Sequence, residues 1–80
     1  MRGDIKKKML AKEMERISKE GITVTFSYML VCDLFTFRLY KDGFAMAKSF
    51  RPDDYCIDFE TIAVTFLTAA EKELIEQVEA

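Results

Sequence analysis

The chain has 80 residues, which leaves room for one small domain, because a chain of this size cannot divide its apolar surface between two cores. Half of the residues are hydrophobic and 32% are charged, a composition that excludes intrinsic disorder, and the formal net charge is −2. No stretch approaches the ~18 consecutive apolar residues of a membrane span, and the first ten residues lack the apolar core of a signal peptide. We therefore expect a cytoplasmic protein that does not bind membranes, with Cys32 and Cys56 as reduced thiols.

A first helix is predicted between Asp4, a suitable N-cap, and Gly21, a suitable helix stop. The intervening sequence IKKKMLAKEMERISKE contains no Pro or Gly, and its inward stripe is Leu10, Met14 and Ile17. The opposite side of this helix is basic and consists of Lys8, Lys12, Arg16 and Lys19. A solvated face is the commoner explanation of such a pattern, and a nucleic-acid-binding surface is the functional alternative.

Three strands are predicted after this helix, because the apolar period changes to two. The first strand, ITVTFSYML, turns one apolar row toward the core. This row consists of Ile22, Val24, Phe26 and Tyr28. The second, DLFTFRLYK, adds a matching row of Phe35, Phe37 and Leu39 and leaves Arg38 and Tyr40 on the opposite face. The two apolar rows line one core.

The turn at Asp42-Gly43 leaves two registers open for the third strand, FAMAKSF, and they place its side chains on opposite faces. A two-residue type I′ loop turns Phe44, Met46, Lys48 and Phe50 toward the core, whereas a three-residue loop beginning at Lys41 turns Ala45, Ala47 and Ser49 there. An unpaired buried lysine costs several kcal/mol, and each exposed large apolar side chain forfeits up to ~2 kcal/mol. The two costs nearly cancel, and we favour the three-residue loop because it leaves Lys48 in water.

The C-terminal segment is predicted to be one long helix capped by Asp58. After a break at RPDD, apolar residues recur at helical spacing at Phe59, Ile62, Ala63, Phe66, Leu67, Ala70, Leu74 and Val78. The alternative is a fourth strand near residues 60–67, because TIAVTFL is rich in β-branched residues, and then a shorter helix with Thr68 and Glu71 as its capping box. The helix has an acidic face of Glu71, Glu73, Glu76 and Glu79, which can imitate nucleic acid for a basic groove or simply be solvated.

The predicted fold is α+β: a helix, a three-stranded antiparallel meander and a helix (α-β-β-β-α), with both helices on one face of the sheet. The other face is then bare, and in the favoured register it carries aromatic, Met and basic side chains, which are enriched in protein interfaces. These candidate partner-binding residues are Arg38, Tyr40, Phe44, Met46, Lys48 and Phe50. The same mixture can stack single-stranded bases, and either outer strand can add a partner strand or a second copy of the chain.

Enzymatic chemistry is not predicted. The sequence contains no histidine, which removes imidazole general bases, Ser-His and Cys-His pairs and imidazole metal ligands. Its two cysteines lack zinc-site spacing, and its three isolated glycines form no phosphate-binding loop. The acidic residues Asp53, Asp54, Asp58 and Glu60 are better explained as loop and capping residues than as ligands of Mg²⁺ or Ca²⁺. We therefore expect no catalytic residue, no metal and no cofactor.

The element order resembles that of double-stranded RNA-binding domains, which are basic at the start of the second helix. Here DFETIAVTFL places Asp58 and Glu60 at that point, so the resemblance is one of topology and implies no RNA-contacting residue. Small size, the lack of catalytic groups and segregated charge also resemble small phage-encoded inhibitors, anti-CRISPR proteins among them, as a class and without a shared motif. We expect a non-enzymatic protein-binding module, and the alternatives are a nucleic-acid-binding domain and a homodimeric structural protein.

Overall fold

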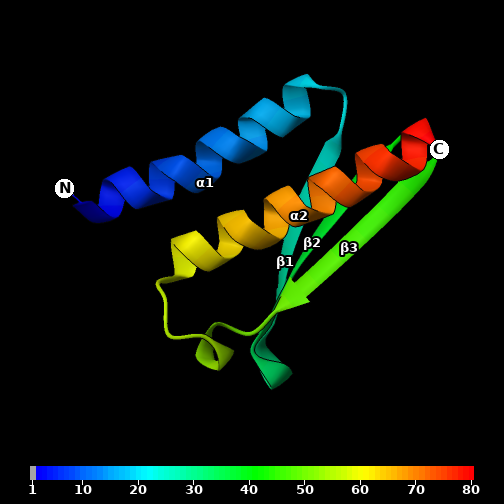
Figure 1. The fold of residues 1–80 in the computed structure, drawn as a ribbon. Helices are drawn as coiled ribbons and strands as arrows, with labels where there is room; N and C mark the ends of the chain where they lie inside the picture. Colours follow the sequence, from blue (N-terminus) through cyan, green and yellow to red (C-terminus); the bar gives the residue numbers. More distant parts are fainter. Residues whose placement is uncertain (1) are drawn as a thin grey trace.

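The computed structural model describes the backbone of residues 2–80 and the side chains of residues 9–80. Its helices are α1 (Arg2–Lys19) and α2 (Phe59–Glu79), its strands are β1 (Thr23–Met29), β2 (Leu34–Lys41) and β3 (Phe44–Phe50), and short 3-10 turns are η1 (Leu30–Cys32) and η2 (Pro52–Asp54). The strands form one antiparallel sheet in the order β1-β2-β3 (Figure 1). The predicted α-β-β-β-α fold is therefore confirmed.

Helix α1 begins at Arg2, so the predicted start at Asp4 is wrong. A glycine such as Gly3 weakens a helix by only about 1 kcal/mol and does not stop it. The predicted end is confirmed, because Gly21 has a φ of +84° and its backbone N–H donates to the carbonyl of Ser18 at 3.1 Å.

Helix α2 is continuous, so the alternative of a fourth strand near residues 60–67 is wrong. The Asp58 carboxylate caps the helix by accepting a hydrogen bond from the backbone N–H of Thr61 at 3.1 Å. Thr68 lies inside the helix, where its hydroxyl donates to the carbonyl of Val64 at 2.9 Å. The β-branched residues are tolerated because packing of the apolar stripe outweighs their small propensity cost.

The hairpin between β2 and β3 closes with a two-residue loop, so the favoured three-residue loop is wrong. Asp42 and Gly43 both have positive φ, 51° and 85°, as a type I′ turn requires. Leu39 consequently pairs with Met46, and Phe37 pairs with Lys48. The side chains of Phe44, Met46, Lys48 and Phe50 therefore share the face that carries Phe37 and Leu39.

Lys48 explains why the expected register was wrong. Its Nζ lies 2.6 Å from Oε2 of Glu73 on α2, and its side chain remains 31% exposed. The lysine is thus neither unpaired nor fully buried, which removes most of the cost that argued against this register. Phe50 on the same face is only 3% exposed, so burial of the apolar side chains decides the balance.

One face of the sheet carries both helices, with α2 packed across β2 and β3 and α1 packed against α2 and β1 (Figure 1). The buried hydrophobic core consists of Leu10, Ile17, Ile22, Phe37, Leu39, Phe50, Ile62, Ala63, Leu67, Ala70 and Leu74. Coverage is thinnest over β1, where Val24 is half-buried and Phe26 and Tyr28 are 37% and 47% exposed. The edge of the sheet formed by β1 is therefore the least protected part of the core.

A candidate protein-binding surface

The observed register separates the six residues that were predicted to form a partner-binding platform. Arg38 and Tyr40 are exposed on the bare face of the sheet. The other four lie on the face that carries the helices, and they are Phe44, Met46, Lys48 and Phe50. These six residues therefore do not form one surface.

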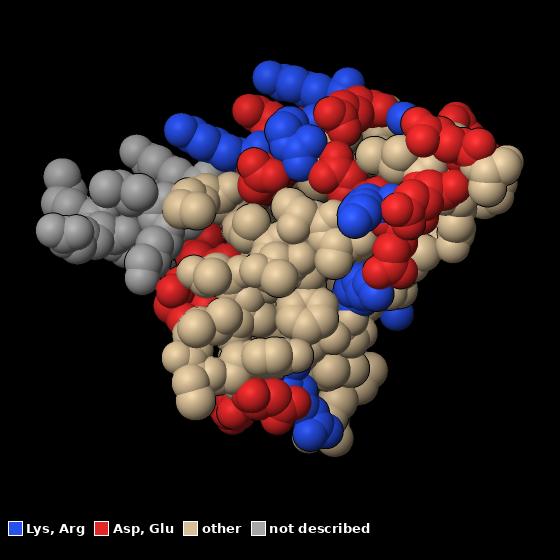
Figure 2. All heavy atoms as spheres, in the orientation of Figure 1, with Lys and Arg blue, Asp and Glu red and all other residues tan. Residues whose placement is uncertain are grey.

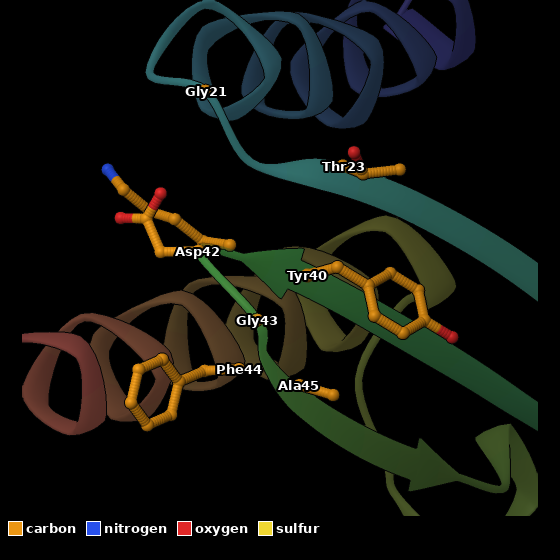
Figure 3. Close-up of a pocket in the computed structure, with 8 residues that line it drawn as sticks. Gly21, Thr23, Tyr40, Asp42, Gly43, Phe44 and Ala45 are labelled. Atoms are coloured by element: carbon orange, nitrogen blue, oxygen red, sulfur yellow. The ribbon is translucent and has the colours of Figure 1, made fainter.

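The bare face has a shallow hollow of about 470 Å³ at its hairpin end, lined by Gly21, Thr23, Tyr40, Lys41, Asp42, Gly43, Phe44 and Ala45. Figure 3 shows that the side chains of Tyr40 and Phe44 leave the hairpin in different directions. A second hollow of about 260 Å³ is lined by Arg38, Tyr40, Ala45, Met46 and Ala47. Neither lining contains a pair of carboxylates or a thiol, so these hollows offer contact area around Tyr40 rather than chemistry.

Exposed apolar side chains gather at the opposite end of the sheet. Because the three strands are antiparallel neighbours, β1 and β3 finish at the same end, and the segment after β3 leads there into α2. Six large hydrophobic side chains at this end are between 43% and 96% exposed: Tyr28, Met29, Leu30, Val31, Tyr55 and Ile57. We call these six residues the apolar end surface.

Aromatic contacts join the two sides of the apolar end surface through the core. The ring centroid of Tyr28 lies 4.5 Å from that of Phe35, and the ring centroids of Phe35 and Phe50 are 5.5 Å apart. Phe50 in turn lies 5.1 Å from Phe66, whose ring is 5.9 Å from Tyr55. Stacked and edge-to-face rings at these separations attract each other beyond simple burial, so both tyrosines are anchored to the aromatic side chains of the core.

The turn η1 is held in place by Tyr28 and Asp33. The Tyr28 hydroxyl donates to Oδ1 of Asp33 at 2.8 Å, and this hydrogen bond to a carboxylate raises the pKa of Tyr28. Asp33 adopts a left-handed φ of 51°, and its backbone N–H donates to the carbonyl of Leu30 at 3.3 Å. The turn consequently presents Leu30 and Val31 to solvent with 79% and 96% of their surface exposed.

Figure 2 shows how charge is distributed over the face that carries the helices. Acidic and basic side chains gather over α1 and the C-terminal half of α2, and a broad uncharged area extends toward η1 and η2. Charged residues also occur at this end, where Arg51, Asp53 and Asp54 are exposed and Asp33 is bonded to Tyr28. A mixture of apolar and charged side chains is common in protein interfaces.

The sequence contained a signal for this surface that periodicity alone did not reveal. The apolar run Met29-Leu30-Val31 spans the last residue of β1 and the start of the connection to β2, where Gly, Asn, Asp, Ser and Pro are the usual residues. Its three side chains are all exposed. An apolar connection that the fold leaves uncovered therefore marks a surface rather than a core segment.

The predicted basic side of α1 is partly neutralised by acidic residues. Arg16 donates two hydrogen bonds to the Glu71 carboxylate, at 2.8 Å and 3.0 Å, and another to Glu13 at 2.9 Å. Lys19 lies 3.8 Å from a carboxylate oxygen of Glu15. Lys12 is exposed, and the side chain of Lys8 lies outside the described residues.

The predicted acidic face of α2 is divided in a similar way. Glu71 is buried between the helices, and the hydrogen bonds from Arg16 lower the pKa of Glu71. Glu73 is occupied by its ion pair with Lys48. Glu76 and Glu79 are exposed, so only these two present carboxylates fully to solvent.

The described residues show no arrangement of groups for metal chemistry. Among them, no group of three or more Cys, Asp or Glu is placed to hold a metal ion, and Cys32 and Cys56 are free. Neither helix, over the part described, has the length and apolar character needed to cross a bilayer.

Comparison with known proteins gives no relative for this chain. No protein-family model matches the chain, and neither a curated protein nor a solved structure matches it significantly.

Proposed function

We propose that this chain is a non-enzymatic protein-binding module that contacts its partner through the apolar end surface. The observation that carries the proposal is the gathering of six exposed large apolar side chains at one end of an 80-residue protein. Large exposed apolar areas on soluble proteins mark interaction sites, because leaving them in water forfeits the free energy of burial. Tyr and Met, which are both present here, are enriched in interfaces.

The contacts of the two tyrosines support the same proposal. The tyrosine–aspartate hydrogen bond and the aromatic contacts hold the side chains of Tyr28 and Tyr55 in place before a partner arrives. A preorganised surface loses little conformational entropy on binding, so more of the burial free energy appears as affinity.

A surface of exposed apolar side chains suits a protein that blocks or tethers its partner. Small phage-encoded inhibitors of host proteins act in this way, and the small size and segregated charge of this chain agree with that class. Free cysteines agree with a reducing compartment such as the cytoplasm.

The proposal is tested by affinity isolation of the tagged protein from lysate of its source organism, with and without nuclease treatment. We expect a stoichiometric protein that survives nuclease and is lost with the double variant Leu30→Asp and Val31→Asp. Phe44→Asp is the matched control, because Phe44 is also an exposed large hydrophobic residue, at 42%, but lies at the other end of the sheet. A partner that the control loses and the double variant retains would contradict the proposal, as would recovery of nucleic acid alone.

A further inference from the structure

The outer edge of β1 is open and uncharged. Its sequence, TVTFSYM, contains no charged residue and no proline. The other edge strand, β3, carries Lys48, which is paired to Glu73 of the α2 helix packed across it. Natural edge strands are usually protected by charge, proline or cover, so β1 is the edge suited to accept another strand.

The hydrogen-bond pattern shows which groups this edge offers. Residues that flank a two-residue hairpin loop form a hydrogen-bonded pair, and bonded pairs alternate with non-bonded pairs along an antiparallel ladder. Lys41 and Phe44 flank the loop here, so alternate residues of β2 bond to β3 and the others bond to the odd-numbered residues of β1. Val24, Phe26 and Tyr28 therefore direct their backbone N–H and C=O groups away from the sheet.

A row of stacked aromatic rings ends at the same edge. The ring centroids of Phe50 and Phe37 are 6.2 Å apart, and those of Phe37 and Phe26 are 4.5 Å apart. Phe26 is 37% exposed, so the row stops in solvent at the middle of β1. A strand added beside β1 would continue this row if it supplied an aromatic residue opposite Phe26.

We infer that two copies of this chain pair antiparallel through β1 and form one continuous sheet of six strands. Pairing about Phe26 places it beside Phe26 of the second copy, Val24 opposite Tyr28, and Thr25 opposite Ser27. The three β1 residues with outward backbone groups then exchange hydrogen bonds across the two-fold axis. A second copy is also matched in charge, because neither strand brings an ionic group into the seam.

Paired substitutions on the solvent-facing side of β1 test this register. Thr25→Lys with Ser27→Lys would place like charges directly opposite each other on both sides of the two-fold axis, and we expect a monomer. Thr25→Lys with Ser27→Glu changes the same positions but places opposite charges there, and we expect the dimer to persist. Light scattering coupled to size-exclusion chromatography measures the molar mass, which is 9.3 kDa for a monomer and twice that for a dimer. Circular dichroism checks that both variants fold.

Wild-type protein that remains at 9.3 kDa across the concentrations tested would overturn the inference, as would the same mass for both double variants. If either variant fails to fold, a mixture of isotope-labelled and unlabelled wild-type protein decides the question. We expect an intermolecular NOE between the Hα of Thr25 and the Hα of Ser27 of the second copy, since a non-hydrogen-bonded pair brings these atoms close. A dimer without this NOE would show that another surface mediates association.

This inference goes beyond the proposed function and does not rest on it. The double variant Leu30→Asp and Val31→Asp leaves the sequence of β1 unchanged, so we expect it to remain dimeric. A dimeric wild-type protein whose partner still binds this double variant would show that the proposed function fails. A monomeric wild-type protein whose partner is lost with this double variant would show that the dimer inference fails.

Discussion

At the scale of single residues, the hydrogen-bonded ion pair between Arg16 and Glu71 is the main polar link between the two helices. Glu71 is 8% exposed, and Arg16 holds the pKa of Glu71 below its ordinary value. A carboxyl group whose pKa is lower in the folded than in the unfolded state stabilises the fold at pH values above its unfolded pKa, about 4.3. That contribution is lost as the pH falls through the lower, folded pKa.

Replacing Arg16 should therefore destabilise the protein in a pH-dependent way. Arg16→Met leaves the Glu71 carboxylate without its main partner, and we expect a loss of about 1–3 kcal/mol in the free energy of unfolding at pH 7. The loss should shrink in acid, because the contribution of the pair declines as the pH falls below the unfolded pKa of Glu71 toward its lower, folded pKa. Urea unfolding at pH 7 and at pH 3 measures both effects.

The matched control for this substitution is Lys19→Met. Lys19 lies on the same helix, and its ion pair with Glu15 is long, at 3.8 Å, and exposed on both sides. Such pairs contribute little, so a change within ~0.5 kcal/mol is expected at either pH. Equal losses for the two variants would show that helix propensity, rather than the Arg16–Glu71 pair, explains the effect.

At the scale of elements, the hairpin between β2 and β3 decides which side chains reach the core. Its two loop residues require positive φ, and a methyl group at Gly43 would meet no atom within 4 Å apart from those of Gly43 and its two chain neighbours. Any free-energy cost of adding a side chain at this position therefore comes from the backbone conformation and not from clashes with neighbouring side chains.

Gly43→Ala should lower the free energy of unfolding by about 1–2 kcal/mol, because L residues other than Asn and Asp disfavour the left-handed region. Gly43→Asn is the control with a larger side chain that tolerates this conformation, and its loss should be smaller. Chemical denaturation of the two variants gives the comparison. If Asn costs more than Ala, the turn is not the type I′ turn described above.

At the scale of the whole molecule, the sheet separates a covered face from a bare one, and two aromatic residues report on that division. Phe50 is 3% exposed beneath α2, and Tyr40 is 43% exposed on the other side. In the register with a three-residue loop, both residues would share the bare face. Their substitutions therefore distinguish the two arrangements.

We expect Phe50→Ala to cost about 3–5 kcal/mol, and Tyr40→Ala to change stability by less than about 1 kcal/mol. An 80-residue domain has a total stability of roughly 4–12 kcal/mol, so Phe50→Leu serves as a milder variant if Phe50→Ala does not fold. Thermal unfolding followed by circular dichroism measures both. Similar small losses for Phe50 and Tyr40 would contradict the observed register.

The sequence by itself determined the order of the elements, the stop at Gly21 and the cap at Asp58, because periodicity and capping depend on neighbours along the chain. It did not determine the register of β3, since the pairing of Lys48 with Glu73 joins residues far apart in the sequence. The apolar end surface was likewise decided by tertiary structure: an apolar segment becomes a surface only when the fold leaves it uncovered. Local chemistry sets which elements form, and long-range packing sets which of their faces remain free to bind.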